Sequence, residues 1–190
     1  MFTNHSATLK PSQSGVTLIE LVMFIVIVSV GIVGILAVMD KTTRHSTDPM
    51  VRKQAIAVAE ALLEEIQQQA FTFCDPDDAN AATAANAAGC ATTPQGLAPT
   101  AGESRGNNTA PFDNVGDYNG FSMTGISDIG GNAITELSAY NANVTVSDGG
   151  LAGVAANDSL RIDVRVFNPG QGVDITLTGY RLRYAPNTTP

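Results

Sequence analysis

The sequence predicts an α+β fold, in which a long N-terminal helix over about residues 16–70 packs on a C-terminal antiparallel β-sheet. A long apolar run is followed by a segment with helical periodicity, and the last third of the chain alternates between apolar and polar residues. We expect residues 16–39 to be the transmembrane half of the helix and residues 40–70 its amphipathic half. Residues 71–190 would form a periplasmic or extracellular globular domain.

The apolar run has the length of a membrane span. Residues 16–39 contain a single charged group, the carboxylate of Glu20. A helix of this length extends for about 36 Å, against about 30 Å of hydrocarbon in a bilayer. A carboxylate inside the bilayer costs about 2.5–3.5 kcal/mol, so the place of Glu20 at the head of the run needs a reason.

The residues before the run have the composition of a leader peptide. Residues 1–15 are polar, and they end in Ser14 and Gly15. An ordinary secretory signal is cut after its apolar region at a motif of small residues, and no such motif follows Met39. We therefore expect cleavage before the run, beside Gly15, where the missing Cβ lets a protease approach the backbone.

The stretch GVTLIELVMFIVIV resembles the class III signal of type IV prepilins and type II secretion pseudopilins. That family ends its leader with Gly, begins the mature chain with an apolar residue, and has Thr or Ser next and Glu at the fifth mature position. Here these residues are Gly15, Val16, Thr17 and Glu20, with Val16 in place of the usual Phe or Met. The resemblance implies that a prepilin peptidase cuts between Gly15 and Val16 and methylates the new α-amino group of Val16.

The same resemblance implies that Glu20 serves in assembly, facing the α-amino group of a neighbouring subunit. In the first helical turn the positive end of the helix dipole offsets part of the cost of the carboxylate, and a docked amine offsets more. A carboxylate at the lipid headgroups with no partner is the alternative. The family further implies a type IV pilin fold, one inner-membrane span before assembly, and then a place in a surface fibre. Its partners would be the inner membrane, prepilin peptidase, other pilin subunits and the pilus assembly machinery.

The amphipathic half has apolar residues at steps of three and four, with charged residues between them. The apolar stripe consists of Val51, Ala55, Val58, Ala59, Leu62, Leu63 and Ile66. We expect Glu60, Glu64 and Glu65 on the opposite, solvated side. Pro49 suits the first position of a helix, which Thr47 or Asp48 could cap, so we expect a bend or brief interruption over residues 44–49.

Two further stretches extend the resemblance. DPMVRKQAIAVAEALLEEI, followed by FCDPD and later by DNVGDYNGFSM, is similar to the D-type minor pilins of the mannose-sensitive haemagglutinin (MSHA) pilus. This similarity implies a structural subunit involved in pilus assembly, adhesion or surface attachment. A pseudopilin of a type II secretion system is one alternative. A membrane-anchored periplasmic binding module that never enters a fibre is another.

The chain has two cysteines, Cys74 and Cys90, both beyond the membrane segment. In an oxidising compartment such a pair usually forms a disulfide, which stabilises by about 3 kcal/mol for a short loop. Two free buried thiols are the alternative. We expect a short Ala-rich helix from Asp77 or Asp78 to Gly89, and an irregular loop over residues 91–119.

Alternating residues predict the strands of the sheet. The apolar members are Leu160, Ile162, Val164 and Val166 in one strand, and Val173, Ile175 and Leu177 in the next. We expect Val166 to pair with Val173, which puts Arg165 opposite Asp174. A bulge at residues 178–179 would turn Tyr180, Leu182 and Tyr184 inward. Residues 143–147 are expected to form a third strand, and Arg181 and Arg183 a solvated or inter-subunit face.

The composition argues against catalysis and against nucleic-acid binding. No His or Lys follows Lys53, which excludes a catalytic triad, a Schiff-base lysine and a His-ligated zinc from the distal domain. From residue 71 onward there are five Arg and twelve acidic residues, a balance that repels phosphate. We predict no catalytic residue, no cofactor and no metal site.

The acidic residues of the distal domain form two groups in the sequence. They are Asp75, Asp77 and Asp78, and Asp113 and Asp117. Their oxygens could bind Ca²⁺, but their spacing does not fit an EF-hand loop. We assign them to helix capping and solvated loops.

Overall fold

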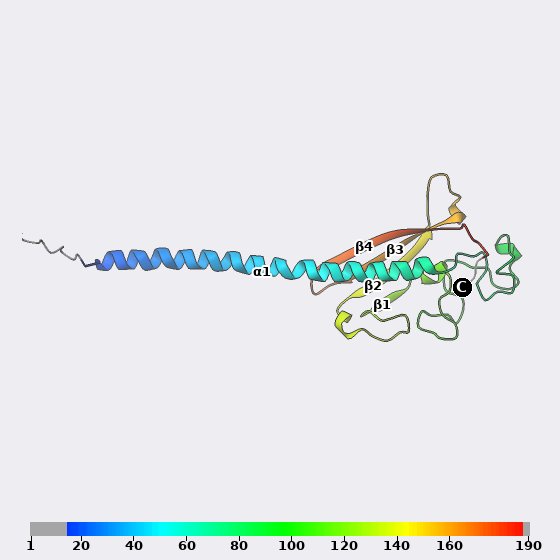
Figure 1. Cartoon of the computed structure of the whole chain (residues 1–190), viewed down its shortest axis with the longest axis horizontal. Helices are drawn as coiled ribbons and strands as arrows, with labels where there is room; N and C mark the ends of the chain where they lie inside the picture. The colour runs from blue at the N-terminus through cyan, green and yellow to red at the C-terminus, as the bar shows by residue number, and fades with distance from the viewer. Residues whose placement is uncertain (1–14, 188–190) are drawn as a thin grey trace, which may run out of the picture. The chain divides into compact units, whose positions relative to one another are not determined.

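The structure, a computed structural model, describes residues 15–187, and the side chains of all of these except residues 41–48. The leader up to residue 14 lies outside the described part. The elements in order, with η marking a 3-10 helix, are α1 (Leu18–Gln68), η1 (Ala87–Gly89), η2 (Val115–Tyr118), β1 (Ser122–Thr124), η3 (Thr135–Leu137), β2 (Asn141–Asp148), η4 (Ala156–Asp158), β3 (Ser159–Asn168) and β4 (Val173–Leu182) (Figure 1). This is the predicted α+β fold: a long helix followed by an antiparallel sheet.

Helix α1 continues through Pro49 without a break, so the predicted interruption is wrong, and neither Thr47 nor Asp48 begins a new helix. A proline removes one backbone hydrogen bond and leaves the helical bonds on either side of it in place. The predicted bend stays a prediction. The chain divides into two compact units, Met1–Thr47 and Asp48–Pro190, and α1 contributes to both.

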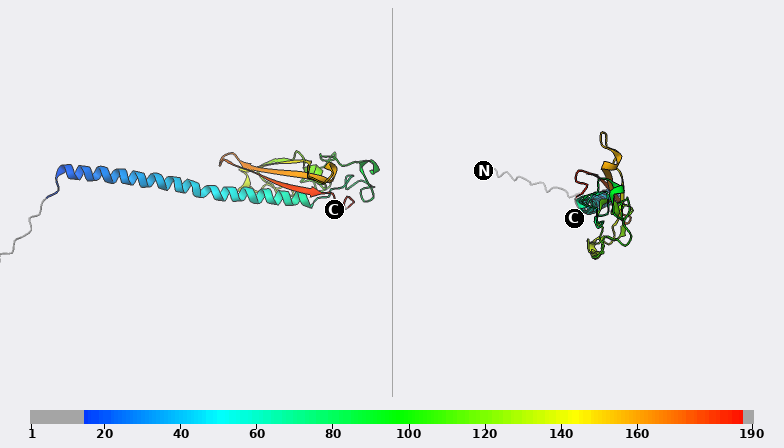
Figure 2. Two further views of the ribbon diagram at one scale, coloured as in Figure 1. Left: turned by 90° about the horizontal axis from the view of Figure 1, so that it is seen from above. Right: turned by 90° about the vertical axis from the view of Figure 1, so that its right-hand side faces the viewer.

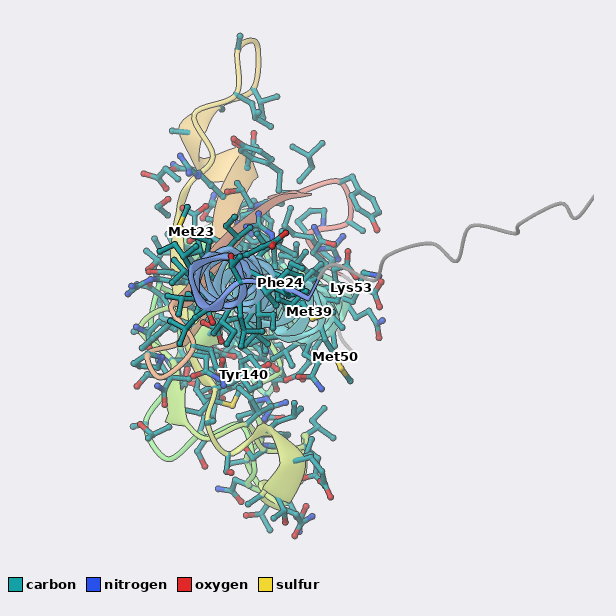
Figure 3. The ribbon with its side chains drawn as sticks, turned by 90° about the vertical axis from the view of Figure 1, so that its left-hand side faces the viewer. Met23, Phe24, Met39, Met50, Lys53 and Tyr140 are labelled. Carbon is teal, nitrogen blue, oxygen red and sulfur yellow. A yellow bond between two sulfur atoms is a disulfide. The ribbon has the colours of Figure 1, made fainter. Side chains whose placement is uncertain are left out.

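The first unit contains the apolar half of α1. Leu18–Asp40 is long and apolar enough to cross a membrane. Its large side chains are exposed along this stretch, and Met23 and Phe24 project from the helix in Figure 3. Among the residues of the first unit that the structure describes, none covers these side chains. Such exposure is expected of a segment that lies in lipid or against other helices.

The second unit contains the amphipathic half of α1 from Asp48 onward, and this part lies along the sheet (Figure 2). Its stripe packs as predicted, with Ala55, Ala59, Leu62 and Ile66 buried in the core. Glu60 and Glu64 are exposed as expected. Glu65 is not, because Arg105 and Tyr118 contact its carboxylate, so its predicted place on the solvated side is wrong.

The sheet has four strands in the order β1-β2-β3-β4, and all neighbouring strands are antiparallel. Strand β2 contains the predicted third strand and is longer at both ends. Alternate residues of β2 and β3 point into the core against α1, including Val144, Ile162 and Val164. Strand β1 was not predicted, because only three residues pair and they have no clear alternation.

The register between β3 and β4 differs from the prediction by two residues. Val173 pairs with Asn168, Val166 with Ile175, and Arg165 with Thr176. A shift of two leaves every side chain on its predicted face, so the hydrophobic pattern cannot detect it. Arg165 is therefore not directly opposite Asp174, yet its Nε still donates to Asp174 Oδ1 across the diagonal at 2.8 Å.

The predicted bulge is also wrong, because the β3–β4 ladder is regular from Ser159 to Asn168. The position of Gly179 therefore faces inward, where a Cβ would lie 2.9 Å from Leu63 Cδ1 of α1. Tyr180 and Leu182 lie on the exposed face. A side chain at position 179 would have to displace the ends of Leu63 and Gln67, so glycine allows the close approach of strand and helix.

The two arginines near the C-terminus are partly buried rather than solvated. Arg181 donates to the carbonyl oxygen of Gln69 at 3.2 Å, and Arg183 donates to that of Phe71 at 3.1 Å. The Arg183 guanidinium lies over the rings of Phe71 and Phe73, 3.7 and 4.3 Å from their centroids. These contacts attach the last strand to the chain just after α1, so the predicted solvated face is wrong, while the inter-subunit face stays a prediction.

Candidate functional site

The N-terminal motif is built around the start of α1. The described chain begins with Gly15, Val16 and Thr17, which lie outside the helix. The Thr17 hydroxyl accepts a hydrogen bond from the backbone N–H of Glu20 at 3.4 Å, and the Thr17 carbonyl accepts one from Leu21 at 3.1 Å. Thr17 is therefore the N-cap of α1.

The bond that the prepilin signal marks for cleavage is accessible. Val16 is 70% exposed, and a Cβ on Gly15 would meet no atom within 4 Å. The bond lies outside the helix, so a peptidase could bind this backbone without unwinding α1. Because Val16 also precedes the cap, its new α-amino group would remain free of helical hydrogen bonds.

Glu20 is exposed in the first turn of α1, where backbone N–H groups lack helical acceptors. A negative side chain is stabilised there by the helix dipole. The prediction missed the role of Thr17. Its signal is present in the sequence, because Thr-x-x-Glu before an apolar run is the pattern of a capping box. Capping therefore fixes the start of the helix three residues before Glu20.

The segment after α1 is fixed by a disulfide and by one carboxylate. Cys74 and Cys90 form a disulfide, with Cα atoms 5.5 Å apart. Asp78 is buried, and its carboxylate accepts hydrogen bonds from the backbone N–H groups of Ala91, Thr92 and Thr93 at 2.7–2.9 Å.

The predicted Ala-rich helix does not form in this segment. Residues 76–83 form turns, and only the three residues of η1 are helical. A reason is that the Asp78 carboxylate binds the backbone of residues 91–93 as well as the nearby N–H of Asn80, and so closes a turn rather than capping a helix. The stretch 91–119 is largely irregular as predicted, apart from isolated bridges and η2.

In the structure the acidic residues are grouped differently from the two groups in the sequence. Asp77 is exposed. The Asp117 carboxylate accepts hydrogen bonds from the backbone N–H of Asn114 at 2.7 Å and from the Gln95 side chain at 2.7 Å. Asp75 and Asp113 instead meet Glu103, and one carboxylate oxygen from each of the three lies within 4.8 Å of the others. Glu103 was not a candidate, because it lies far from both groups in the sequence.

Residues 10–36 match the family model of the prokaryotic N-terminal methylation motif. No curated protein and no solved structure matches the chain. The motif corresponds to the class III prepilin signal that the sequence around Gly15 and Glu20 resembles. A methylation motif of this kind marks a structural subunit rather than an enzyme, in keeping with the predicted lack of catalytic residues in the distal domain.

Proposed function

We propose that this chain is a minor pilin of an MSHA-like type IV pilus. In this proposal prepilin peptidase removes residues 1–15 and methylates Val16. The chain waits in the inner membrane, anchored by residues 16–39, with the domain of residues 71–190 outside. It then joins other pilin subunits through the pilus assembly machinery and serves in assembly, adhesion or surface attachment.

One observation carries the proposal. The methylation motif stands at the head of an apolar helix, and the same helix continues into a stretch that packs on an antiparallel sheet. The cleavage bond is accessible, and Glu20 lies in the first turn of that helix, where an incoming amine could reach it. The MSHA assignment rests on the similarity of the stretches within residues 48–77 and 113–123, and on the long loops that separate helix and sheet.

A pseudopilin of a type II secretion system is the second candidate, because it shares the motif and the helical anchor. A deletion strain separates the two. Loss of sheared surface pili with normal protein secretion supports the pilin. Loss of secreted enzymes with normal piliation supports the pseudopilin. A membrane-anchored binding module would change neither.

Glu20→Ala tests the assembly role itself. The variant should insert into the inner membrane and be cleaved as before, because the apolar run and Gly15 are unchanged. It should be absent from sheared fibres, because its carboxylate no longer compensates a neighbouring amine. Glu64→Ala is the matched control, since Glu64 is an exposed helical carboxylate outside the motif. Equal incorporation of both variants would refute assembly through Glu20.

A further inference from the structure

Three loop segments of the second unit bring carboxylates together away from the N-terminal motif. Asp75 lies in the disulfide loop, Glu103 in the irregular stretch, and Asp113 just before η2. One oxygen from each lies within 4.8 Å of the others. Oxygen ligands bind Ca²⁺ at roughly 2.3–2.6 Å, so oxygens on opposite sides of one ion are up to about 5 Å apart. The three carboxylates are thus close enough to share one ion.

Buried oxygens in this cluster lack partners. Asp75 is only 3% exposed, and its Oδ1 accepts the backbone N–H of Asp77 at 2.8 Å. Its Oδ2 is buried and has no hydrogen-bond partner, and the same holds for Asp113 Oδ1. Buried carboxylate oxygens are rarely left unsatisfied in folded proteins, because they would lose their hydrogen bonds to water without forming new ones. A cation would satisfy both atoms.

The electrostatics also favour a cation. Burial, and then the Asp117 carboxylate, raise the pKa of Glu103 to about 7. Burial, and then the Asp75 carboxylate, raise the pKa of Asp113 to about 7. Burial is the larger cause of both shifts, and the neighbouring carboxylates add to it. A divalent cation would neutralise these negative charges.

We propose that Asp75, Glu103 and Asp113 bind one Ca²⁺ ion. All three donors are carboxylates, which suit Ca²⁺, whereas protein zinc sites favour Cys and His. Mg²⁺ is less suitable, since it demands shorter bonds and near-ideal octahedral geometry. Water would complete the coordination. The ion would tie the disulfide loop, the irregular stretch and the start of η2 together, where Glu103 is otherwise held by the backbone N–H of Thr100 at 3.0 Å.

The test uses the full chain in detergent micelles, stripped with EDTA and titrated with CaCl₂. Calorimetry should show one Ca²⁺ per chain, and the ion should raise the Tm. Glu103→Gln should weaken Ca²⁺ binding at least tenfold, on the order of the loss of one charged ligand. In EDTA at pH 8, above the Glu103 pKa of about 7, the same variant should melt above the wild type, because a repelling charge is gone. In CaCl₂ this order should reverse.

Glu136→Gln is the matched control, because Glu136 is exposed and outside the cluster. It should bind Ca²⁺ as the wild type does. Asp113→Asn repeats the test from another segment, should Glu103→Gln fail to fold. The proposal is overturned if the wild type shows no binding heat and no rise in Tm up to about 10 mM CaCl₂, above the usual range of extracellular calcium modules. An equal rise in Tm in both cluster variants would mean general charge screening, and would overturn it too.

Discussion

The guanidinium of Arg105 binds the carboxylate of Glu65 at two points, with Nε–Oε1 and Nη2–Oε2 both 2.7 Å long. Their side chains are only 9% and 15% exposed. The Tyr118 hydroxyl donates to the same carboxylate at 2.8 Å, and Arg105 also donates to the carbonyl oxygens of Ser127 and Asp128. One residue of α1 therefore holds two loops and η2 against the helix.

Glu65→Ala should destabilise the second unit by about 3–5 kcal/mol, because it leaves the Arg105 guanidinium buried without its partner. Chemical denaturation of the full chain in micelles measures the change. Glu64→Ala, one residue away and exposed, should stay within about 0.5 kcal/mol of the wild type. Equal effects of the two substitutions would show that the pair contributes nothing beyond helix propensity.

Glu65 also shows where sequence periodicity stops being informative. The apolar stripe of α1 identified the buried face correctly, since burial of Ala55, Leu62 and Ile66 follows from spacing alone. Glu65 lies at the edge of that face, and its partner is 40 residues away. No local pattern indicates that a distant arginine will cover an edge carboxylate.

Asp78 gives the fold a pH dependence. Hydrogen bonds from the backbone N–H groups of Thr92, Ala91 and Thr93 hold the pKa of its carboxyl well below the usual value of 3.8. Its contribution to stability is therefore complete above pH 3.8, and is lost as the pH falls toward the lower folded pKa. Asp78→Asn should lower the Tm at pH 7, and the difference from the wild type should shrink as the pH falls below about 4.

Thermal unfolding of the wild type and of Asp78→Asn at several pH values measures how their Tm values converge. Asp77→Asn is the control, because Asp77 lies one residue away and is exposed. A Tm difference between Asp78→Asn and the wild type that stays constant from pH 7 to about pH 2 would contradict an ionic role for Asp78.

Gly179 sets the distance between β4 and α1. An added Cβ would lie 2.6 Å from Gln67 Nε2 and 2.9 Å from Leu63 Cδ1, so both side chains would have to move. Gly179→Ala should cost about 1–3 kcal/mol, although alanine ordinarily stabilises a strand relative to glycine. Gly96→Ala should be neutral or slightly stabilising, because a Cβ there meets nothing within 4 Å. Denaturation midpoints compare the two, and a neutral Gly179→Ala would show that the helix and strand can separate freely.

The sheet and the acidic cluster mark further limits of the sequence. Alternation identified the inward residues of β3 and most of those of β4, but a register two residues away has the same faces. The hydrophobicity of the aromatic residues after Gly179 predicts that they face inward. The regular β3–β4 ladder instead keeps Tyr180 on the exposed face. Asp75, Glu103 and Asp113 meet only through the folding of the long loop, for which the sequence has no period.

Mass spectrometry of the mature chain, purified from cells with an active prepilin peptidase, tests the central claim most directly. The mature chain should begin at Val16, be one methyl group heavier than its sequence, and be two hydrogens lighter for the disulfide between Cys74 and Cys90. A chain that still begins at Met1, or that is cut elsewhere and carries no methyl group, would contradict it.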